Sequence, residues 1–327
     1  MKLSLIIPCY NEQDNIMPFF EETVKAFQQM PKAITSFEMV FVNDGSSDNT
    51  SKNLKELYKS YSSVVTVVDF SRNFGKEAAM LAGLRHAKGD FVTIIDADLQ
   101  QRPEIVVKMV EHLLANEDCD MIAAYQEERI EGKLMSFMKK AFYKCINVAS
   151  DIDFYQGASD FRTFRKRVAE AILSLPEYYR FSKGIFSWIG FNTYFMPYVA
   201  EERMSGETKF SFFKSLKYAT DGIIAFTTLP LKIATGAGIL AFVASILYMF
   251  VVIIQKLFFG VDVPGYATIV VLILFLGGLQ LLLLGVVGEY LARTYIQGKN
   301  RPVYIEKEVL IAKSKSFRED TDNEKNC

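Results

Sequence analysis

The sequence contains few residues that could hold a soft metal ion or form disulfide bonds. Its 327 residues include only four cysteines and two histidines. These are Cys9, Cys119, Cys145 and Cys327, together with His86 and His112. No pair of cysteines has the C-x-x-C spacing of a zinc site, and their scatter gives no disulfide framework. We therefore expect reduced thiols and no structural zinc.

The chain also lacks an excess of charge of either sign. It has 37 basic and 38 acidic residues, which leaves a net charge of −1. A protein that binds nucleic acid through its bulk charge would carry a basic excess, so we expect no nucleic-acid partner. We also expect no cleavable signal peptide, because the apolar run at 3–8 is short and polar residues follow it at once.

Long uncharged runs occur in one part of the sequence only. Residues 233–254 form 22 positions without a charge, and residues 266–288 form 23. A helix needs about 20 apolar residues to cross the hydrocarbon core of a bilayer. The linker between the two runs is too short to hold a domain, so the sequence predicts a hairpin of two transmembrane helices.

Basic residues flank this hairpin on the side of both chain ends. Those before it are Lys214, Lys217 and Lys232, and those after it are Arg293, Lys299, Arg301 and Lys307. The linker between the two runs holds only Lys256 and Asp262. By the positive-inside rule, we expect a two-span plasma-membrane protein with both termini in the cytoplasm.

The first 230 residues alternate between apolar runs and helical patterns. The apolar runs lie at 3–8, 37–44, 64–70 and 91–98. The helical patterns lie at 13–29, 48–60, 75–87 and 103–116. Near-continuous apolar runs rich in Val and Ile are typical of buried parallel strands. The alternation therefore predicts an α/β fold with a mostly parallel, Rossmann-like sheet.

Acidic residues collect where the predicted strands end, which is where α/β sheets bind their ligands. They are Glu12, Asp44, Asp96 and Asp98. Residues i and i+2 of a strand point the same way, so Asp96, Asp98 and Gln100 would present three oxygens together if the strand stays extended. Such oxygens suit Mg²⁺ or Mn²⁺. The alternative is a solvated turn, since two aspartates one residue apart are a weak pattern alone.

Four stretches in this order carry a family resemblance. They read SLIIPCYNEQDNI, VFVNDGSSDNT, FSRNFGKEAAMLAGLRHAKGDFVTIIDADLQQRPE and GASDFRTF. They resemble the family 2 glycosyltransferases with the GT-A fold, and within them the polyisoprenyl-phosphate glycosyltransferases, the branch similar to dolichol-phosphate-mannose synthase. The end of the second apolar run, GVVGEYLARTYIQGKNRPVYI, is similar to the members with two C-terminal spans. The resemblance covers residues 1 to about 305.

The resemblance implies roles for the acidic residues at the strand ends. Pro8, Tyr10 and Glu12 would line the nucleotide pocket, and Asp44 would lie near the base and ribose. The pair Asp96 and Asp98, assisted by Gln100, would hold Mg²⁺ or Mn²⁺ against the diphosphate of a nucleotide sugar. Asp98 would count as catalytic, because that cation stabilises the departing nucleoside diphosphate. Strand-end packing remains the alternative for Pro8 and Tyr10.

The resemblance also implies a catalytic place for Asp160, near the sugar carbon under attack. In the family this residue is often cast as the base, but that role is open, because a phosphate monoester has a second pKa near ~6 and is largely ionised without a base. Asp160 would then position the acceptor or stabilise positive charge on the sugar. The alternative is a structural N-cap for a helix at 161–174. Ser159 stands where relatives often have glycine.

Two basic segments complete the expected site. The loop at 202–210 resembles the family's R-x-x-G-x-S/T-K loop, so Arg203 and Lys209 would clamp the diphosphate. The segment 127–144 places hydrophobic residues at helical spacing beside basic ones, which suits a membrane surface. From this segment we expect three residues near the acceptor phosphate: Arg129, Lys133 and Ser136. A solvated surface is the alternative for both segments.

Together these features predict a glycosyltransferase and its layout. The expected parts are a GT-A domain at 1–210, an amphipathic helix at 211–230, the hairpin at 231–292 and a cytoplasmic tail at 293–327. We expect inverting transfer from a nucleotide sugar, with UDP the commonest nucleotide in this branch, to a polyprenyl phosphate. A homo-oligomer, with a tetramer suspected, is expected from relatives. The alternatives are an inactive membrane scaffold and a processive synthase, which the missing Q-x-x-R-W motif disfavours.

Overall fold

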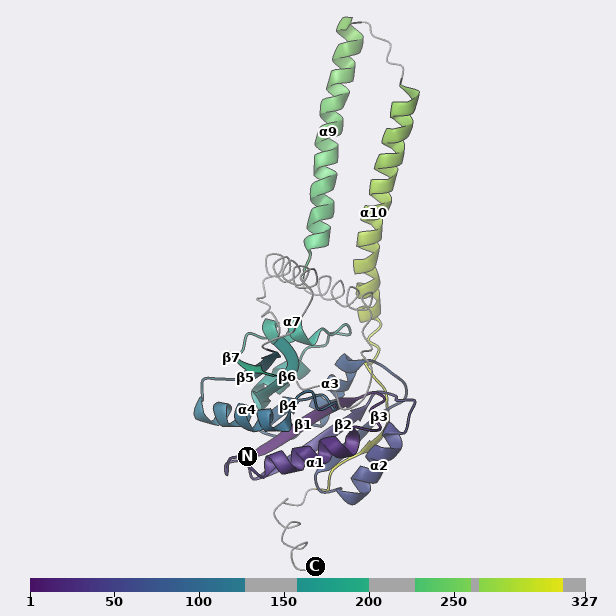
Figure 1. Ribbon diagram of the computed structural model, residues 1–327. Helices are drawn as coiled ribbons and strands as arrows, with labels where there is room; N and C mark the ends of the chain where they lie inside the picture. Colours follow the sequence, from purple (N-terminus) through teal and green to yellow (C-terminus); the bar gives the residue numbers. More distant parts are fainter. Residues whose placement is uncertain (127–157, 200–226, 260–264, 314–327) are drawn as a thin grey trace, which may run out of the picture.

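The computed structural model describes residues 1–126, 158–199, 227–259 and 265–313 (Figure 1). These residues form an α/β domain from which two long helices project side by side. The expected α/β class with a C-terminal apolar hairpin is confirmed. The amphipathic segment at 127–144 and residues 211–226 of the one expected at 211–230 lie outside the described residues.

Within the described residues, eight strands form a mixed sheet at the centre of the domain, in the order β7-β5-β6-β4-β1-β2-β3-β8. The strands are β1 (Lys2–Cys9), β2 (Ser36–Asn43), β3 (Val65–Phe70), β4 (Phe91–Ile94), β5 (Met121–Gln126), β6 (Ala158–Arg165), β7 (Thr193–Tyr198) and β8 (Glu306–Leu310). Strands β4, β1, β2 and β3 are parallel neighbours, as the sequence predicts. Strands β6 and β8 pair antiparallel with β4 and β3.

Helices cover both faces of the sheet. They are α1 (Ile16–Phe27), α2 (Thr50–Ser60), α3 (Lys76–His86), α4 (Pro103–Ala115), α6 (Lys166–Leu173) and α7 (Ser182–Trp188). Side chains of β1 alternate between two cores: Leu5 and Ile7 join the core under α1 and α4, while Ile6 joins the core under α3 and α6. This alternation follows from the period of two along a strand. Both strand faces are apolar, which explains the near-continuous apolar runs.

Helix α3 packs unusually close to the sheet. A Cβ atom on Gly83 would lie 2.1 Å from Cγ2 of Ile6. Only a glycine at this position lets the helix approach β1 so closely. The contact sets the distance between α3 and the sheet. It therefore also sets the position of Lys76 and Glu77, which begin the helix.

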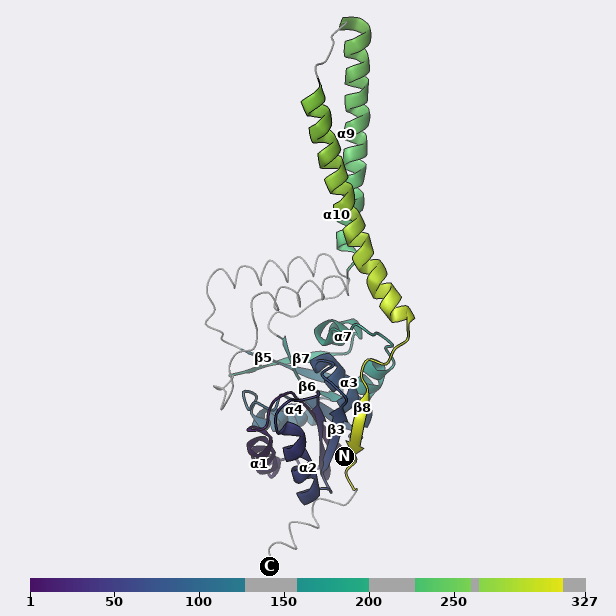
Figure 2. The same cartoon turned by 90° about the vertical axis from the view of Figure 1, so that its right-hand side faces the viewer.

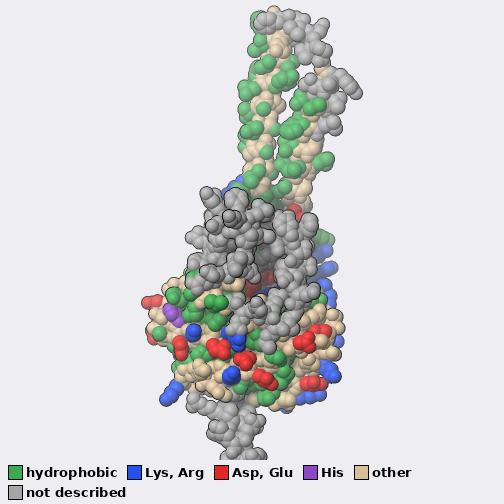
Figure 3. All heavy atoms as spheres, viewed as in Figure 1, with side chains coloured by type: hydrophobic (Ala, Val, Ile, Leu, Met, Phe, Trp, Pro, Cys, Tyr) green, Lys and Arg blue, Asp and Glu red, His purple; other side chains and the backbone are tan. Residues whose placement is uncertain are grey.

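The two projecting helices are long and apolar. They are α9 (Leu229–Phe259) and α10 (Tyr266–Gly298), and α10 extends ten residues beyond the apolar run that predicts it. Within them, Leu229–Val252 and Val271–Gly298 have mean hydropathies of 2.1 and 2.5, and both are long and apolar enough to cross a membrane. Hydrophobic side chains are exposed along both helices (Figure 3). Apolar surface on this scale marks a contact with lipid or with another protein.

The chain returns from α10 to the sheet and adds β8 at its edge. Residues 306–310, which the sequence places in the C-terminal tail, pair antiparallel with β3. Phe70, the last residue of β3, pairs with Glu306, the first residue of β8. The carboxyl end of β3 therefore lies on the side of α10, and so do the carboxyl ends of its parallel neighbours (Figure 2).

Contacts of Gln297 and of the chain just beyond α10 join this helix to the domain. Gln297 donates from Nε2 to the carbonyl of Pro176 at 2.9 Å and accepts the backbone N–H of Tyr178 at 2.8 Å. Beyond the helix, the buried ring of Tyr304 stacks on Phe70 with centroids 4.8 Å apart. The end of the second apolar helix is thus held against the side of the domain that carries the strand carboxyl ends.

Replacing Tyr304 with alanine should destabilise the domain by about 3–5 kcal/mol, the usual cost of truncating a large buried aromatic residue. The change removes the stack on Phe70 and the hydrogen bond that the guanidinium of Arg85 donates to the hydroxyl at 3.0 Å. Denaturant unfolding in detergent would measure it. Tyr304→Phe keeps the ring and should cost only about 1 kcal/mol. Equal losses in the two variants would contradict a packing role for the ring.

Candidate active site

Two loops at the carboxyl ends of β1 and β2 hold each other in place. Asn11 donates its backbone N–H to Ser46 Oγ at 2.9 Å, and its side-chain oxygen accepts the backbone N–H of Ser47 at 2.9 Å. Gly45 has a φ of +61°, and a Cβ there would lie 2.3 Å from the backbone of Arg72. The turn at NDGSSDNT thus depends on a glycine that allows both this φ and this approach.

Asp44 is buried and braces the start of α3. Its carboxylate accepts the backbone N–H of Phe74 at 2.6 Å and that of Gly75 at 2.9 Å. Burial raises the pKa of Asp44, and these two N–H groups act in the opposite direction. Its predicted position near a base and ribose stays a prediction. The structure shows that Asp44 holds, by hydrogen bonds, the turn that directly precedes Lys76.

The aspartate pair lies in a turn and not on a strand. Strand β4 ends at Ile94, and Leu99 has a positive φ of 58°. The expectation that Asp96, Asp98 and Gln100 share one face of an extended strand is therefore wrong. A residue with positive φ reverses the chain locally, which an extended strand does not allow.

Hydrogen bonds inside this turn hold both carboxylates. The buried Gln101 accepts the backbone N–H of Asp96 at 3.1 Å and donates from Nε2 to its carboxylate at 3.3 Å. Gln100 donates its backbone N–H to Asp98 at 3.2 Å. The glutamine whose side chain contacts the pair in this structure is thus Gln101, one residue beyond the predicted one.

Lys76 connects the aspartate pair to Asp160. Its ammonium lies 2.6 Å from a carboxylate oxygen of Asp96 and 3.5 Å from one of Asp160. Burial works against the charge on Lys76, but the two carboxylates outweigh it and raise the pKa of Lys76. The antiparallel pairing of β4 with β6 brings together two carboxylates that lie 64 positions apart in the sequence, and Lys76 offsets their repulsion.

Asp160 lies on β6, with its side chain 17% exposed. The alternative role as an N-cap is wrong, because the helix begins at Lys166. Burial would raise the pKa of Asp160, but Lys76 and Lys183 outweigh it and lower that pKa. The hydroxyl of Ser182 also contacts the carboxylate at 3.0 Å. Asp160 is therefore an ionised carboxylate close to Asp96.

Four residues of this cluster escaped the sequence reasoning: Lys76, Glu77, Gln101 and Ser182. Lys76 and Glu77 follow β3 at the carboxyl edge, so the rule that sites collect there could have found them. Gln101 lies beside the predicted Gln100. Ser182 had no sequence pattern, because it reaches Asp160 only through the packing of α7 on β6.

The other predicted residues divide into two groups. Pro8 and Tyr10 lie at the end of β1, with Tyr10 exposed, and Glu12 accepts a hydrogen bond from the side chain of Asn15 at 2.6 Å. Five predicted residues lie outside the described part of the chain: Arg129, Lys133, Ser136, Arg203 and Lys209. Their roles stay predictions.

The donor set fits a hard cation that shares its coordination with a substrate. Among the described residues, no group of three or more His, Cys, Asp or Glu could hold a metal ion. Mg²⁺ typically uses one or two carboxylates together with substrate phosphates and waters. Asp96 and Asp98, in one short turn, match that requirement, and we expect the diphosphate of a substrate to supply the remaining ligands.

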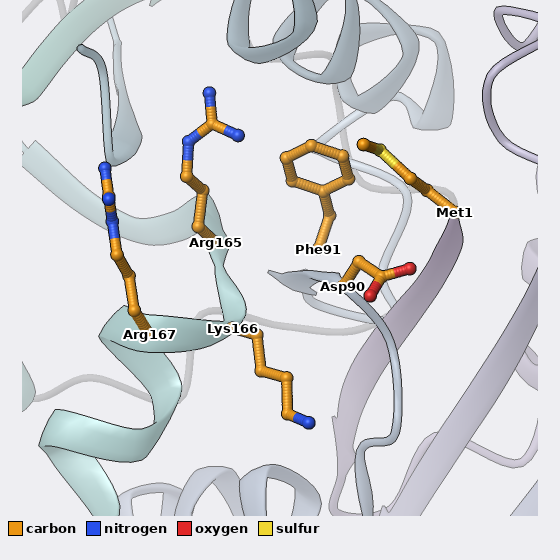
Figure 4. Close-up of a pocket in the computed structure, with 6 residues that line it drawn as sticks. All are labelled: Met1, Asp90, Phe91, Arg165, Lys166 and Arg167. Carbon is orange, nitrogen blue, oxygen red and sulfur yellow. The ribbon is translucent and has the colours of Figure 1, made fainter. Parts of the chain in front are cut away.

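A hollow elsewhere on the domain is less suited to this chemistry. It is lined by Met1, Asp90, Phe91, Arg165, Lys166 and Arg167 (Figure 4). It lies where β1 and β4 begin, at the edge opposite the aspartates. Arg165 donates to three backbone carbonyls, and Arg167 pairs with Asp120. These two cations have structural partners, so we place the active site at the carboxyl edge.

Comparison with models of known protein families shows to which family the chain belongs. Residues 4–173 match the model of glycosyl transferase family 2, and residues 229–294 match that of the GtrB C-terminal hairpin. The chain belongs to glycosyl transferase family 2. The resemblance read from the sequence is thereby confirmed, together with the mixed α/β GT-A fold and its apolar hairpin.

Relatives in this family align over nearly the whole chain. Bactoprenol glucosyl transferase of Shigella phage SfII is 42% identical over 93% of this chain and 97% of its own. The prophage bactoprenol glucosyl transferase homolog of Escherichia coli K12 is 40% identical over 94% and 99%. Putative glycosyltransferase CsbB of Bacillus subtilis is 39% identical over 94% and 92%.

Solved structures are more distant. Glucosyl-3-phosphoglycerate synthase of Mycobacterium tuberculosis, in complex with Mg²⁺ and UDP, is 16% identical with a TM-score of 0.45. The alignment covers 68% of this chain and 78% of that one.

Replacing Lys76 with methionine should lower the rate of sugar transfer by about tenfold or more, because a hydrogen bond between charged groups is worth about 1.5–3 kcal/mol. The change keeps the apolar stem but leaves Asp96 and Asp160 without their shared cation. Initial rates of transfer would measure it. Lys166→Met is the control, since the exposed Lys166 pairs with Glu170 of its own helix at 3.8 Å, at the sheet edge opposite Asp96 and Asp160. Equal rates in both variants would place Lys76 outside the reaction.

Proposed function

We propose that this family 2 glycosyltransferase transfers a sugar from a nucleotide sugar to a polyprenyl phosphate at the cytoplasmic face of the plasma membrane. One observation carries the proposal: the sheet edge with Asp96 and Asp160 lies on the side of the two apolar helices. A polyprenyl chain stays in the bilayer, because leaving it would expose much apolar surface to water. Relatives named bactoprenol glucosyl transferase support this acceptor.

The donor would lie across the carboxyl ends of β1, β2 and β4. Pro8, Tyr10, Glu12 and Asp44 would line the nucleotide, with UDP as the proposed nucleotide. Asp96 and Asp98, with Gln100 nearby, would hold Mg²⁺ or Mn²⁺, which neutralises the charge that develops on the leaving diphosphate.

Basic residues would complete the diphosphate site. Lys76, at the start of α3, already lies between Asp96 and Asp160 and would contact the diphosphate from the side of that helix. Arg203 and Lys209 would clamp it from the other side. Preorganised positive charge of this kind stabilises the transition state more than the bound substrate.

The acceptor would approach from the membrane side. Its phosphate oxygen attacks the anomeric carbon and expels the nucleoside diphosphate in a single inverting step, with no covalent sugar–enzyme intermediate. Arg129, Lys133 and Ser136 would hold the lipid phosphate. Asp160, which is ionised and held by Lys76, would position the attacking oxygen or stabilise positive charge on the sugar ring.

The proposed layout follows the sequence, with β8 added to the domain at 1–210. The segment at 211–230 would lie along the bilayer up to Leu229, where α9 begins. The hairpin at 231–292 would cross the membrane, and the tail at 293–327 would return to the cytoplasm after α10 ends at Gly298. We also propose a homo-oligomer, with a tetramer suspected. Gly277 and Gly278 of α10 would let helices approach closely, as small residues do in membranes.

Purified protein with polyprenyl phosphate and a panel of labelled nucleotide sugars would test this function. We expect transfer that stops in EDTA, returns with Mg²⁺ or Mn²⁺, and falls by about 100-fold or more in Asp98→Asn, since the cation stabilises the leaving group. Asp118→Asn is the control, because Asp118 is exposed at the opposite sheet edge. Full activity of Asp98→Asn in EDTA would refute the metal-assisted mechanism.

The proposed topology predicts which cysteines an impermeant thiol reagent reaches in intact cells. Cys9 and Cys119 are buried, so a Cys145→Ser variant leaves Cys327 as the thiol to follow. We expect no labelling of Cys327 from outside, because the positive-inside rule places it in the cytoplasm. Asp262→Cys, in the linker between the spans, should be labelled as a matched control. Labelling of Cys327 without permeabilisation would reverse the topology.

A further inference from the structure

One hydroxyl group bridges two carboxyl groups beside the proposed reaction centre. Oγ of Ser182, the first residue of α7, lies 3.0 Å from Oδ1 of Asp160 and 3.0 Å from Oε1 of Glu77. The backbone N–H of Ser182 lies 3.0 and 3.1 Å from the two oxygens of Glu77. The three residues belong to α3, β6 and α7, so the bridge ties three elements together.

Counting protons shows what this bridge requires. A serine hydroxyl donates one proton, and an ionised carboxylate accepts hydrogen bonds without donating any. With both carboxylates ionised, the single hydroxyl proton would serve only one of them, and the other contact would bring two oxygen lone pairs together. One of the two carboxyl groups must therefore hold a proton for both contacts to be hydrogen bonds.

The surrounding charges decide which carboxyl group holds it. Asp160 faces Lys76 of α3, Arg162 of its own strand and Lys183 of α7. Glu77 faces Arg180, which precedes α7, and the negative charge of Asp160. Burial and the charge of Asp160 raise the pKa of Glu77 to about 7, whereas the pKa of Asp160 is lowered. The proton therefore belongs to Glu77.

We propose that Glu77 is a positioning residue of the transfer reaction, donating its carboxyl proton to Ser182 Oγ so that Ser182 donates its own proton to Asp160. The inference rests on the proposed function, in which Asp160 works beside the reacting carbon. Glu77 itself touches neither substrate nor metal. When Glu77 donates to Ser182, the hydroxyl proton of Ser182 points to Asp160. Oδ1 of Asp160 is then held by Ser182 while Oδ2 is held by Lys76.

Loss of the proton from Glu77 changes this arrangement. Two neighbouring negative charges then repel each other, and the hydroxyl of Ser182 has two competing acceptors. Asp160 then shares the Ser182 proton with Glu77, and its contact with Lys76 remains. The rate of transfer should therefore fall as the pH rises through the pKa of Glu77.

The same proton links folding to pH. The pKa of Glu77 is higher in the folded chain than the ordinary value of 4.5. The folded state thus binds more protons than the unfolded state between the two pKa values, and its stability declines as the pH rises through that window. This contribution is fully present below the unfolded pKa and is lost above the folded one, so the pH dependence of unfolding reports on the bridge without any substrate.

The test compares Glu77→Gln with the unaltered chain in detergent. A glutamine cannot ionise, but its amide still donates to Ser182 Oγ and accepts the backbone N–H. We expect kcat of the unaltered protein to fall about tenfold between about pH 6 and about pH 8.5, and kcat of Glu77→Gln to stay within about twofold of its low-pH value. The KM for the nucleotide sugar should change little in either, because the bridge holds Asp160 and not the donor.

Two further variants separate this role from a structural one. Ser182→Ala removes the bridge, so kcat should be low at every pH and show no step near neutrality. Glu177→Gln is the matched control: burial also raises the pKa of Glu177, and it too faces Arg180. It should keep the pH profile of the unaltered protein. A step that persists in Glu77→Gln would overturn the inference.

Infrared spectroscopy and unfolding provide readouts that do not require activity. A protonated-carboxyl band should be present near about pH 6, fade by about pH 8.5 and be absent from Glu77→Gln. The decline in stability between the two pKa values of Glu77, 4.5 unfolded and about 7 folded, should flatten in the variant. A protein that transfers sugar but shows no such band would overturn this inference alone. A protein that shows the band but transfers nothing to polyprenyl phosphate would overturn the proposed function and, with it, the part of Glu77 in the reaction.

Discussion

Asp96, in the turn after β4, and Asp160, on the neighbouring strand β6, lie close together, and the ammonium group of Lys76 lies between their carboxylates. Like charges gathered at one sheet edge repel, and the edge is stable only if cations lie among them. Other features serve this placement. Gly83 lets α3 approach the sheet, Asp44 braces the turn before it, and Gln101 holds the backbone and carboxylate of Asp96. A substrate diphosphate with its cation would enter a site whose charges are already balanced.

Much of the fold could be predicted because it follows from local pattern. Strands β1 to β4 are buried on both faces and read as apolar runs, and α9 and α10 read as uncharged ones. Strand β8 could not be predicted in this way, since its sequence EKEVL is short and charged and its pairing partner lies more than 230 residues earlier. Only the packed domain presents the edge of β3 that β8 completes.

In the site, too, local sequence pattern predicts some features, and tertiary contacts decide the others. Asp96, Asp98 and Asp160 were predicted, from strand-end position and from the family's motifs. Their geometry was not, because the positive φ of Leu99 and the antiparallel pairing of β6 with β4 are decided by tertiary contacts. The bridge through Ser182 is further from prediction still. It joins residues 77, 160 and 182, and no spacing or periodicity relates positions that meet only when α3, β6 and α7 pack together.

The contacts of Gln297 and β8 make α10 a lever. A helix of 33 residues at 1.5 Å per residue is about 50 Å long, so a change of about 10° in its tilt displaces one end by about 9 Å relative to the other. Transmembrane helices adjust their tilt to bilayer thickness. Because the domain end of α10 is hydrogen-bonded to Pro176 and Tyr178, that displacement is applied to the short segment that leads into Ser182. In the proposed membrane arrangement, a change in lipid thickness that tilts α10 would therefore act on the segment next to Asp160.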